Sequence, residues 1–435
     1  MSFREELQHL SPVWHRVTDI VVDRGEGAYV YDVNGRRYLD FTCGYGVTNT
    51  GHCHPRVVSA AREQIGKIIH AQVNIAWHEP MLRLVKELRD VTPEGLDSFF
   101  FSNSGAEAIE ASVKLARFAT RRAGIIVFKG SFHGRTVAAM SLTTSNAKYR
   151  SNYQPLMAGV SVAPYANCYH CPVGDRSTSV DGVKGFPGED VCEMWCLEEL
   201  EDVLRLQSAP GDTAAILLEP ALGEGGYVHP PRAWLRGVSE IARENGILLV
   251  ADEIQSGFGR TGRFFAVEHA GVSPDIVVMA KALASGFPLS GIATRPGIME
   301  KWQAGTHGGT YGGNAVSCAA AVATLHVLRD EGLVENAARM GDYLMENLRG
   351  LRERHPLIGD VRGRGLMVAT EFTAPDGTAA SIAGTMATDC QDRGMLVLTA
   401  GHRDNIIRWI PPLIVTEDQI DVGVEIFEEA LAAAE

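Results

Sequence analysis

Between residues 98 and 294, short apolar runs alternate with stretches whose apolar residues recur at helical spacing. The runs at 215–218 and 247–250 are apolar at every position, which is typical of strands that helices cover on both faces of a parallel sheet. The stretches at 106–120 and 232–244 are amphipathic. This alternation predicts an α/β domain with a mostly parallel central sheet. We expect its strands at residues 98–102, 124–128, 214–219, 246–252, 275–280 and 290–294.

Both ends of the chain follow a different pattern. Near the N-terminus, residues 28–41 predict a β-hairpin that turns at Asn34-Gly35. After about residue 315 a long helical stretch leads to predicted strands at 365–372, 395–398 and 406–409, and to a closing helix from Thr416. We therefore expect a large cofactor-binding α/β domain over residues 51–319 and a smaller α+β domain built from residues 1–50 and 320–435.

Composition narrows the classes of partner and compartment. The chain has 435 residues and a formal net charge of −13, which argues against nucleic acid or anionic lipid as a partner. No apolar stretch approaches the ~20 residues of a membrane helix, and the first ten residues do not resemble a secretory signal. We expect a cytoplasmic enzyme with reduced thiols.

Four of the eight cysteines are closely spaced. Cys168 and Cys171, then Cys192 and Cys196, could hold zinc or an iron–sulfur cluster by their spacing. They lie in or just after residues 165–188, a segment rich in Gly, Pro, Ser and Cys that is predicted to be a surface insertion. Free or partly oxidised thiols are the favoured interpretation, so no bound metal is predicted.

Polar residues follow several predicted strands at the point where each strand ends. They are the run 102–107, Glu219, Asp252 and Lys281. Because the carboxyl ends of parallel strands share one edge of a sheet, and such edges bind ligands, these side chains predict a site.

The residue types suggest its chemistry. A lysine with a desolvated stem has a lowered pKa and can form a Schiff base, although a lone lysine is more often a surface residue. A carboxylate such as Asp252 after four apolar residues is either in a structural ion pair or functional. Beside the pyridine nitrogen of pyridoxal phosphate, it would keep that nitrogen protonated. Ser104-Gly105-Ala106 opens a helix whose N–H groups suit a phosphate, or it forms only a capping box with Glu107.

These motifs resemble those of the class III (ornithine/4-aminobutyrate type) pyridoxal-phosphate-dependent aminotransferases. The similarity is carried by residues 51–55, 104–108, 132–136, 251–262 and 309–314 and by the spacing from Asp252 to Lys281. It implies the aspartate-aminotransferase-like fold, fold type I, and pyridoxal 5'-phosphate as cofactor. It also implies a homodimer with shared active sites, possibly a dimer of dimers.

The resemblance implies a role for each matching residue. Lys281 would be the Schiff-base lysine and proton carrier, and Asp252 would hold the ring nitrogen. The other implied cofactor contacts are Gln255 at the phenolic oxygen, Phe132 and Ile254 on the ring faces, His133 in the same segment, and Ser104, Gly105, Ala106 and the second chain's Thr310 at the phosphate.

Substrate identity rests on four residues. Arginine pairs well with carboxylates, and Arg135 matches a carboxylate-binding arginine of the 4-aminobutyrate and ornithine enzymes, while Glu224 and Arg408 resemble their switch pair. The leading hypothesis is transfer from a 4-aminobutyrate-like ω-amino acid to 2-oxoglutarate. Tyr45 resembles the ornithine enzymes, so an ornithine or diamine donor stays open. Residues 168–172 resemble a segment of class III racemases and epimerases, which leaves that activity open too. A dehydrogenase is disfavoured because no G-x-G-x-x-G follows the first strand.

Overall fold

A seven-stranded sheet forms the centre of the molecule. The computed structural model describes residues 4–174, 178–180, 183–188, 191–374 and 377–434. Strand β12 runs antiparallel to both of its neighbours, and the other strands are parallel to one another. The prediction of a mostly parallel sheet is thus confirmed. In spatial order the strands are β4 (Ser98–Ser102), β12 (Ser290–Thr294), β11 (Ile276–Met279), β10 (Leu248–Asp252), β9 (Thr213–Leu218), β5 (Gly124–Phe128) and β6 (Val160–Ala163).

Helices bury both faces of this sheet, which explains the uninterrupted apolar runs. In β9, Ala215 and Leu217 pack in one cluster with residues of α5 (Gly105–Thr120). The alternate residues Ile216 and Leu218 belong to a second cluster with Trp234 of α8 (Arg232–Glu244). Because successive side chains of a strand point to opposite faces, every position of such a strand must be apolar.

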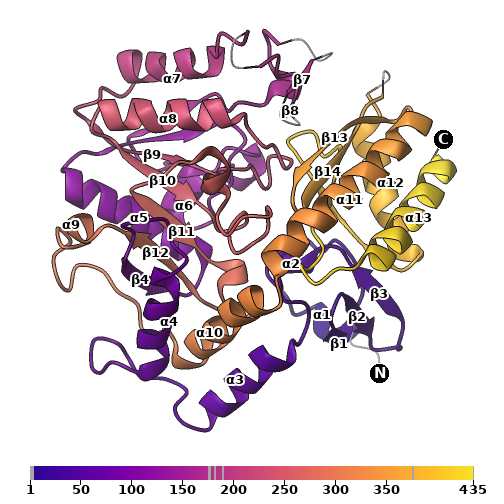
Figure 1. The fold of residues 1–435 in the computed structure, drawn as a ribbon, viewed down its shortest axis with the longest axis horizontal. Coiled ribbons are helices and arrows are strands. Elements are labelled where there is room, and N and C mark those ends of the chain that lie inside the picture. Colours follow the sequence, from indigo (N-terminus) through magenta and orange to yellow (C-terminus); the bar gives the residue numbers. More distant parts are fainter. Residues whose placement is uncertain (1–3, 175–177, 181–182, 189–190, 375–376, 435) are drawn as a thin grey trace.

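The two ends of the chain meet in smaller sheets. Strands β1 (Val22–Glu26), β2 (Tyr29–Asp32) and β3 (Arg37–Asp40) are joined by β15 (Met395–Leu396), which pairs in parallel with β3. Another sheet has the order β13 (Ile358–Arg364), β14 (Met367–Phe372), β17 (Ile406–Trp409) and β16 (Leu398–Ala400). Figure 1 shows β1 to β3 (indigo) beside helices α11 to α13 (orange to yellow), on one side of the molecule.

One sequence-based expectation was wrong in this part, and one strand was not predicted. Residues 395–398 do not form one strand: the chain leaves β3 after Leu396 and pairs with β17 from Leu398 onward, so it changes sheets at Val397. Strand β13 was not predicted because Asp360, Arg362 and Arg364 interrupt its apolar pattern. Asp360 and Arg362 are nevertheless buried, since they form an ion pair with a 2.9 Å separation.

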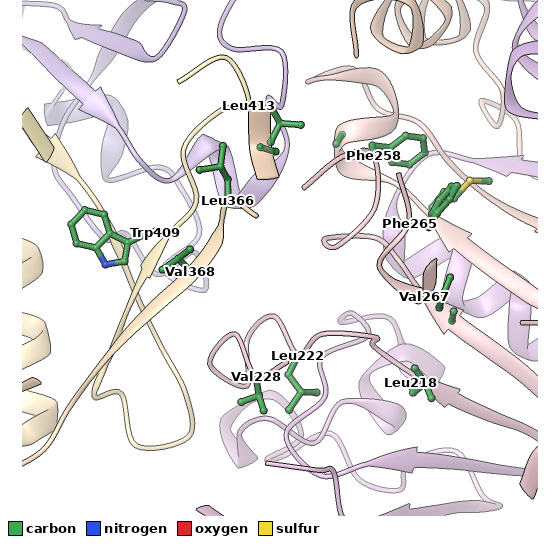
Figure 2. Packing of buried hydrophobic residues seen from close by; sticks show 14 of the residues in the cluster. Leu218, Leu222, Val228, Phe258, Phe265, Val267, Leu366, Val368, Trp409 and Leu413 are labelled. Carbon is green, nitrogen blue, oxygen red and sulfur yellow. The ribbon is translucent and has the colours of Figure 1, made fainter. Parts of the chain in front are cut away.

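One hydrophobic cluster runs from the central sheet into the terminal part. It contains Leu218 and Val267 from the large sheet's side and Val368 and Trp409 from β14 and β17. Figure 2 shows these residues around the loops that join the two parts, with Leu222 and Val228 next to each other. The shared core fixes the loops between the two parts, and the predicted domain boundaries stay a prediction.

The remaining elements complete the structure. No helix of the described residues is both long and apolar enough to cross a membrane. The other α-helices are α1 (Arg4–Leu7), α2 (Cys43–Gly46), α3 (Pro55–Ile65), α4 (Glu79–Arg89), α6 (Val137–Leu142), α7 (Trp195–Leu206), α9 (Pro296–Met299), α10 (Ala315–Asp330), α11 (Leu333–Arg354), α12 (Ala379–Asp392) and α13 (Glu417–Ala434). The other described elements are the short strands β7 (Ser179–Val180) and β8 (Val183–Lys184) and the 3₁₀ helices η1 (Ala147–Tyr149), η2 (Cys168–His170), η3 (Ala266–Ala270) and η4 (Lys281–Ala284).

Candidate active site

A cavity of about 510 Å³ opens at the carboxyl edge of the central sheet. Segments that follow β4, β5, β9, β10 and β11 line it, and the terminal part of the chain adds Tyr45 and Arg408. Thr310 does not line its own chain's cavity, so its proposed role in a second chain's site stays a prediction. The predicted residues that the structure does bring together here are Tyr45, Ser104, Gly105, Ala106, Phe132, His133, Arg135, Glu224, Asp252, Ile254, Gln255, Lys281 and Arg408.

Strand β11 ends at Met279. Ala280 follows it, and Lys281 begins the 3₁₀ helix η4. Its backbone has φ of +46°, a left-handed conformation that is uncommon for a residue with a side chain. Burial lowers the pKa of the Lys281 amine to about 8, against the opposing charges of Asp252 and Glu219. A substantial share of this amine is therefore uncharged and nucleophilic near neutral pH.

Asp252 ends strand β10 and is buried. One carboxylate oxygen is 2.7 Å from Nδ1 of the buried His133, and the other accepts the backbone N–H of Ile254 at 3.1 Å. The Asp252 carboxylate is therefore both paired and held in one orientation at the cavity wall. His133, which also lines the cavity, supports the orientation of Asp252, and its predicted contact with the cofactor stays a prediction.

Glu219 at the end of β9 organises the surrounding loops. Its carboxylate accepts the backbone N–H groups of Phe132 and Gly223, both at 2.8 Å. Burial raises the pKa of Glu219, although the nearby His133 opposes that shift. Glu219 thereby fixes the Phe132 segment and the loop that carries Glu224.

The N-terminus of α5 shows that the two interpretations of its sequence are compatible. Ser104 and Glu107 form the capping box: the Ser104 hydroxyl accepts the Glu107 N–H at 3.3 Å, and the Glu107 carboxylate accepts the Ser104 N–H at 2.8 Å. The N–H groups of Gly105 and Ala106 have no acceptor inside the helix, because the first amides of any α-helix lack one. They line the cavity and suit a dianion. A Cβ at Gly105 would lie 2.9 Å from Ile254 Cδ1, so the end of the Ile254 side chain would have to shift to make room for it.

The remaining wall offers ring faces and one free polar atom. Phe132 packs edge-on against Tyr149 with ring centres 5.3 Å apart. Gln255 donates its side-chain N–H to the Tyr45 carbonyl at 2.9 Å, while its Oε1 is buried without a partner among the described residues. An amine of lowered pKa, an oriented carboxylate, free helix amides and an unpaired amide oxygen fit pyridoxal phosphate.

A second group of side chains in the cavity wall is joined by hydrogen bonds and contains two arginines. Arg408 on β17 donates to Glu224 at 3.0 Å and to the Thr399 carbonyl at 2.9 Å. The Tyr149 hydroxyl donates to the other Glu224 oxygen at 2.9 Å, and the Arg135 guanidinium lies 5.1 Å from the centre of the Tyr149 ring. Burial and the charge of Glu224 raise the pKa of Tyr149 to about 12, so it stays a donor.

Comparison with known proteins decides the family, because the model of the aminotransferase class-III family matches residues 10–431. The chain belongs to the class III aminotransferases. It is 38% identical to an acetylornithine aminotransferase of Archaeoglobus fulgidus, over 97% of this chain and 98% of that one. It is 36% identical to the 4-aminobutyrate aminotransferase of Escherichia coli, over 96% and 95% of the two chains.

Solved structures agree. The ornithine aminotransferase from Toxoplasma gondii has a TM-score of 0.85 at 29% identity and covers 99% of this chain and 94% of its own. An amine transaminase from an uncultivated Pseudomonas species in the PLP-bound form has a TM-score of 0.88 at 28% identity, over 98% and 99% of the two chains. This class III aminotransferase has fold type I and uses pyridoxal 5'-phosphate, with an amino donor and a 2-oxo acid as substrates.

Tyr149 was missed by sequence reasoning. It lies on the short helix η1, in a segment without apolar periodicity, and its partner Glu224 is 75 residues away along the chain. Nothing in its local sequence signals a place in the active site of this aminotransferase.

The four clustered cysteines line another cavity, of about 760 Å³. All four are free thiols, and burial followed by the other three sulfurs raises the pKa of Cys168. Within the described parts of the chain, no three His, Cys, Asp or Glu side chains are placed to hold a metal ion. Residues 175–177 and 181–182 of the predicted insertion lie outside the described residues, and the prediction that the aminotransferase binds no metal stays a prediction.

Proposed function

We propose that this aminotransferase moves the amino group of a 4-aminobutyrate-like ω-amino acid to 2-oxoglutarate, giving a semialdehyde and glutamate. One observation carries the proposal. The cavity that holds Lys281 is also lined by Arg135 and by Arg408, which is paired with Glu224.

When bound, pyridoxal phosphate supplies an aldehyde for the amino group and a ring that accepts electrons. Lys281 would hold the cofactor and would carry the proton to and from the substrate carbon that bears the amine. Asp252, oriented by His133, would hold the ring nitrogen in its protonated form. The amides of Gly105 and Ala106 would bind the phosphate.

The two arginines explain how one cavity accepts two kinds of substrate. An ω-amino acid has one carboxylate, distant from its amine, and Arg135 is the cation for it. Glutamate and 2-oxoglutarate have a second carboxylate, for which Arg408 must become free. The side chain of Glu224 is 25% exposed and that of Arg408 only 4%, and Thr399 also holds Arg408. Glu224 is therefore the member that moves.

A homodimer with shared sites is part of the proposal. Exposed apolar side chains gather in segments next to the 309–314 loop, where Tyr311 packs on His70 with ring centres 5.4 Å apart. Such a patch suits an interface between copies, and it would carry Thr310 toward the second site. The exposed apolar residues concerned are Ile68, Ile69, Ile75, Trp77 and Tyr311.

An ornithine or diamine donor is the second candidate. Tyr45 is 46% exposed at the cavity, and the Arg408 guanidinium lies 5.3 Å from the centre of its ring. A racemase or epimerase would not need Glu224 to release Arg408, and the named relatives are aminotransferases.

A donor panel tests the proposal. The donors are 4-aminobutyrate, ornithine, β-alanine, putrescine and branched amino acids, with 2-oxoglutarate as acceptor and glutamate formation as the readout. We expect 4-aminobutyrate or a near homologue to have the highest kcat/KM. With amine alone, an aminotransferase converts its cofactor to the pyridoxamine form, whereas a racemase keeps the aldehyde form.

Arg135→Ala refines the test. The change should raise the KM for 4-aminobutyrate at least about tenfold, the cost of losing a charged pair, and leave the KM for putrescine nearly unchanged. Arg205→Ala is the matched control, because Arg205 is a solvent-exposed arginine of α7 whose ion pairs, among the described residues, are with its helix neighbours. Equal losses for both donors would remove Arg135 from the carboxylate role.

A further inference from the structure

The loop between β9 and α8 carries Glu224, yet much of its support comes from the other part of the chain. Within the loop, Gly226 donates to the Gly223 carbonyl at 3.1 Å, and Leu222 and Val228 form a single β-bridge. From the terminal part, the Gly401 N–H donates to the Glu224 carbonyl at 3.0 Å. The backbone of Glu224 is thus held from the small-domain side.

Arg362 on β13 gives the loop a further support from the terminal part of the chain. Its Nε and one terminal nitrogen both donate to the Gly226 carbonyl, at 3.1 and 2.7 Å. Gly226 has φ of +112°, and a side chain there would lie 2.5 Å from Ile406 Cδ1. Only glycine lets the loop present its carbonyl to the guanidinium fork at this point.

Arg362 is buried and its charge is balanced locally. Its remaining terminal nitrogen is 2.9 Å from Asp360 and 2.7 Å from Glu371, both nearly inaccessible to solvent. The other Glu371 oxygen is 2.7 Å from Nε2 of His170, which lies between Cys168 and Cys171. A continuous series of polar contacts therefore runs from the cysteine-rich segment through Glu371 and Arg362 to the Glu224 loop.

We infer that Arg362 is a positioning residue for Glu224 and thereby sets how strongly the enzyme prefers ω-amino acids over glutamate as amino donors. This inference rests on the proposed function, because it requires Glu224 to mask Arg408. Arg362 does not line the cavity, so its effect on substrates must pass through the loop. Glu224 is only two residues from Gly226 along the chain. A displacement of Gly226 should therefore move Glu224 as well and weaken its pairing with Arg408.

The test compares amino donors in single half-reactions with the full holoenzyme. Arg362→Lys keeps the positive charge between Asp360 and Glu371 but removes the fork on Gly226. It should raise the kcat/KM ratio of glutamate over 4-aminobutyrate about tenfold, the size of one lost hydrogen bond to a charged group. Arg354→Lys is the matched control, since Arg354 pairs with Glu428 on the surface of the same part of the chain, and it should leave the ratio unchanged.

A double-mutant cycle separates positioning from general damage. Glu224→Ala alone should raise the ratio, and adding Arg362→Lys to it should change the ratio less than twofold, because the residue through which Arg362 acts is gone. An unchanged ratio in folded Arg362→Lys, or full additivity in the double variant, would overturn the inference. If Arg362→Lys does not fold, Glu371→Gln serves instead: it leaves the Asp360 pair and should raise the ratio about threefold, and no change would overturn the inference.

Failure of the proposed function gives a different result. A wild-type enzyme that does not turn over 4-aminobutyrate contradicts the proposed donor before any variant is made. The double-mutant cycle is then measured with glutamate and with the best donor of the panel that lacks an α-carboxylate. The coupling between Arg362 and Glu224 is judged from the kcat/KM ratio of these two donors.

Discussion

Lys281 should capture the cofactor with a pH dependence that an ordinary lysine cannot show. The environment lowers the pKa of its amine from 10.5 to about 8. At pH 7.4 about one-fifth of such an amine is uncharged, against fewer than about one in a thousand for an amine of ordinary pKa. Since only the uncharged amine attacks an aldehyde, capture at pH 7.4 should gain about two hundredfold from the shift alone.

The rate of capture is measured by mixing cofactor-free enzyme with pyridoxal phosphate between pH 6 and 10 and following the visible absorbance of the bound form. Each rate is divided by the rate of Nα-acetyl-lysine, whose free side-chain amine reacts with the same cofactor in the same buffer. This division removes the effect of the cofactor's own ionisation. The corrected rate should be constant below about pH 8 and fall as the pH is raised above it, because Lys281 is then fully uncharged while the model amine is still losing protons. Lysine's ordinary behaviour, a rate proportional to the model amine across the whole range, would refute the reasoning.

Asp252 provides the perturbation with a defined sign. Its negative charge raises the Lys281 pKa against the effect of burial, so Asp252→Asn should move the midpoint to lower pH. Lys281→Ala should give no covalent capture at any pH. A midpoint that moves upward in Asp252→Asn would show that the two side chains do not interact as the structure indicates.

Three further predictions concern the cofactor site, the mask and stability. Gly105→Ala should raise the Kd for pyridoxal phosphate about tenfold, the cost of about one strained contact, because the new Cβ meets Ile254; equilibrium dialysis measures it. Tyr149→Phe removes the hydrogen bond to Glu224 and should raise the half-reaction ratio of glutamate to 4-aminobutyrate about threefold. Burial alone would raise the pKa of Glu371, but His170 and Arg362 lower it to about 2. The ionised carboxylate therefore stabilises the fold at neutral pH, and this contribution is lost as the pH falls from about 4.5 toward 2. Glu371→Gln should make the free energy of unfolding in urea less sensitive to acid, and an unchanged pH profile would count against the ion pair.

Much of the cofactor site could be predicted from the sequence because its signals are local. Asp252 and Lys281 each follow a run of buried apolar residues, and such runs identify parallel strands without knowledge of the fold. Once the strands are known, their carboxyl ends must share an edge, which brings the two residues together. The capping box at Ser104 is likewise a pattern of neighbouring residues, and the structure forms it.

The residues that the sequence did not indicate depend on contacts over long chain separations. Arg362 and Gly226 are 136 residues apart, and Tyr149 and Glu224 are 75 apart. In the sequence, Asp360 and Arg362 look like surface charges that break an apolar run, and only the tertiary structure shows that they neutralise each other in the interior. The charged residues of β13 therefore concealed both the strand itself and the contact of Arg362 with the Glu224 loop.

The residues proposed to hold the cofactor and the proposed Glu224–Arg408 pair are supported by different parts of the chain, and Arg135 follows β5 on the cofactor side. Lys281, Asp252, Gly105 and Ala106 all follow strands of the central sheet, whereas Arg408 comes from β17. Glu224 belongs to the large part of the chain but is held by Gly401 and paired with Arg408 from the terminal part. A shift of the terminal part would therefore displace Arg408 and, through Gly401, the Glu224 loop, whereas Lys281, Asp252, Gly105 and Ala106 belong to the large part. Changes of donor preference at constant cofactor affinity should accordingly arise from substitutions in β13, β16 and β17, including the Arg408 position at the cavity wall.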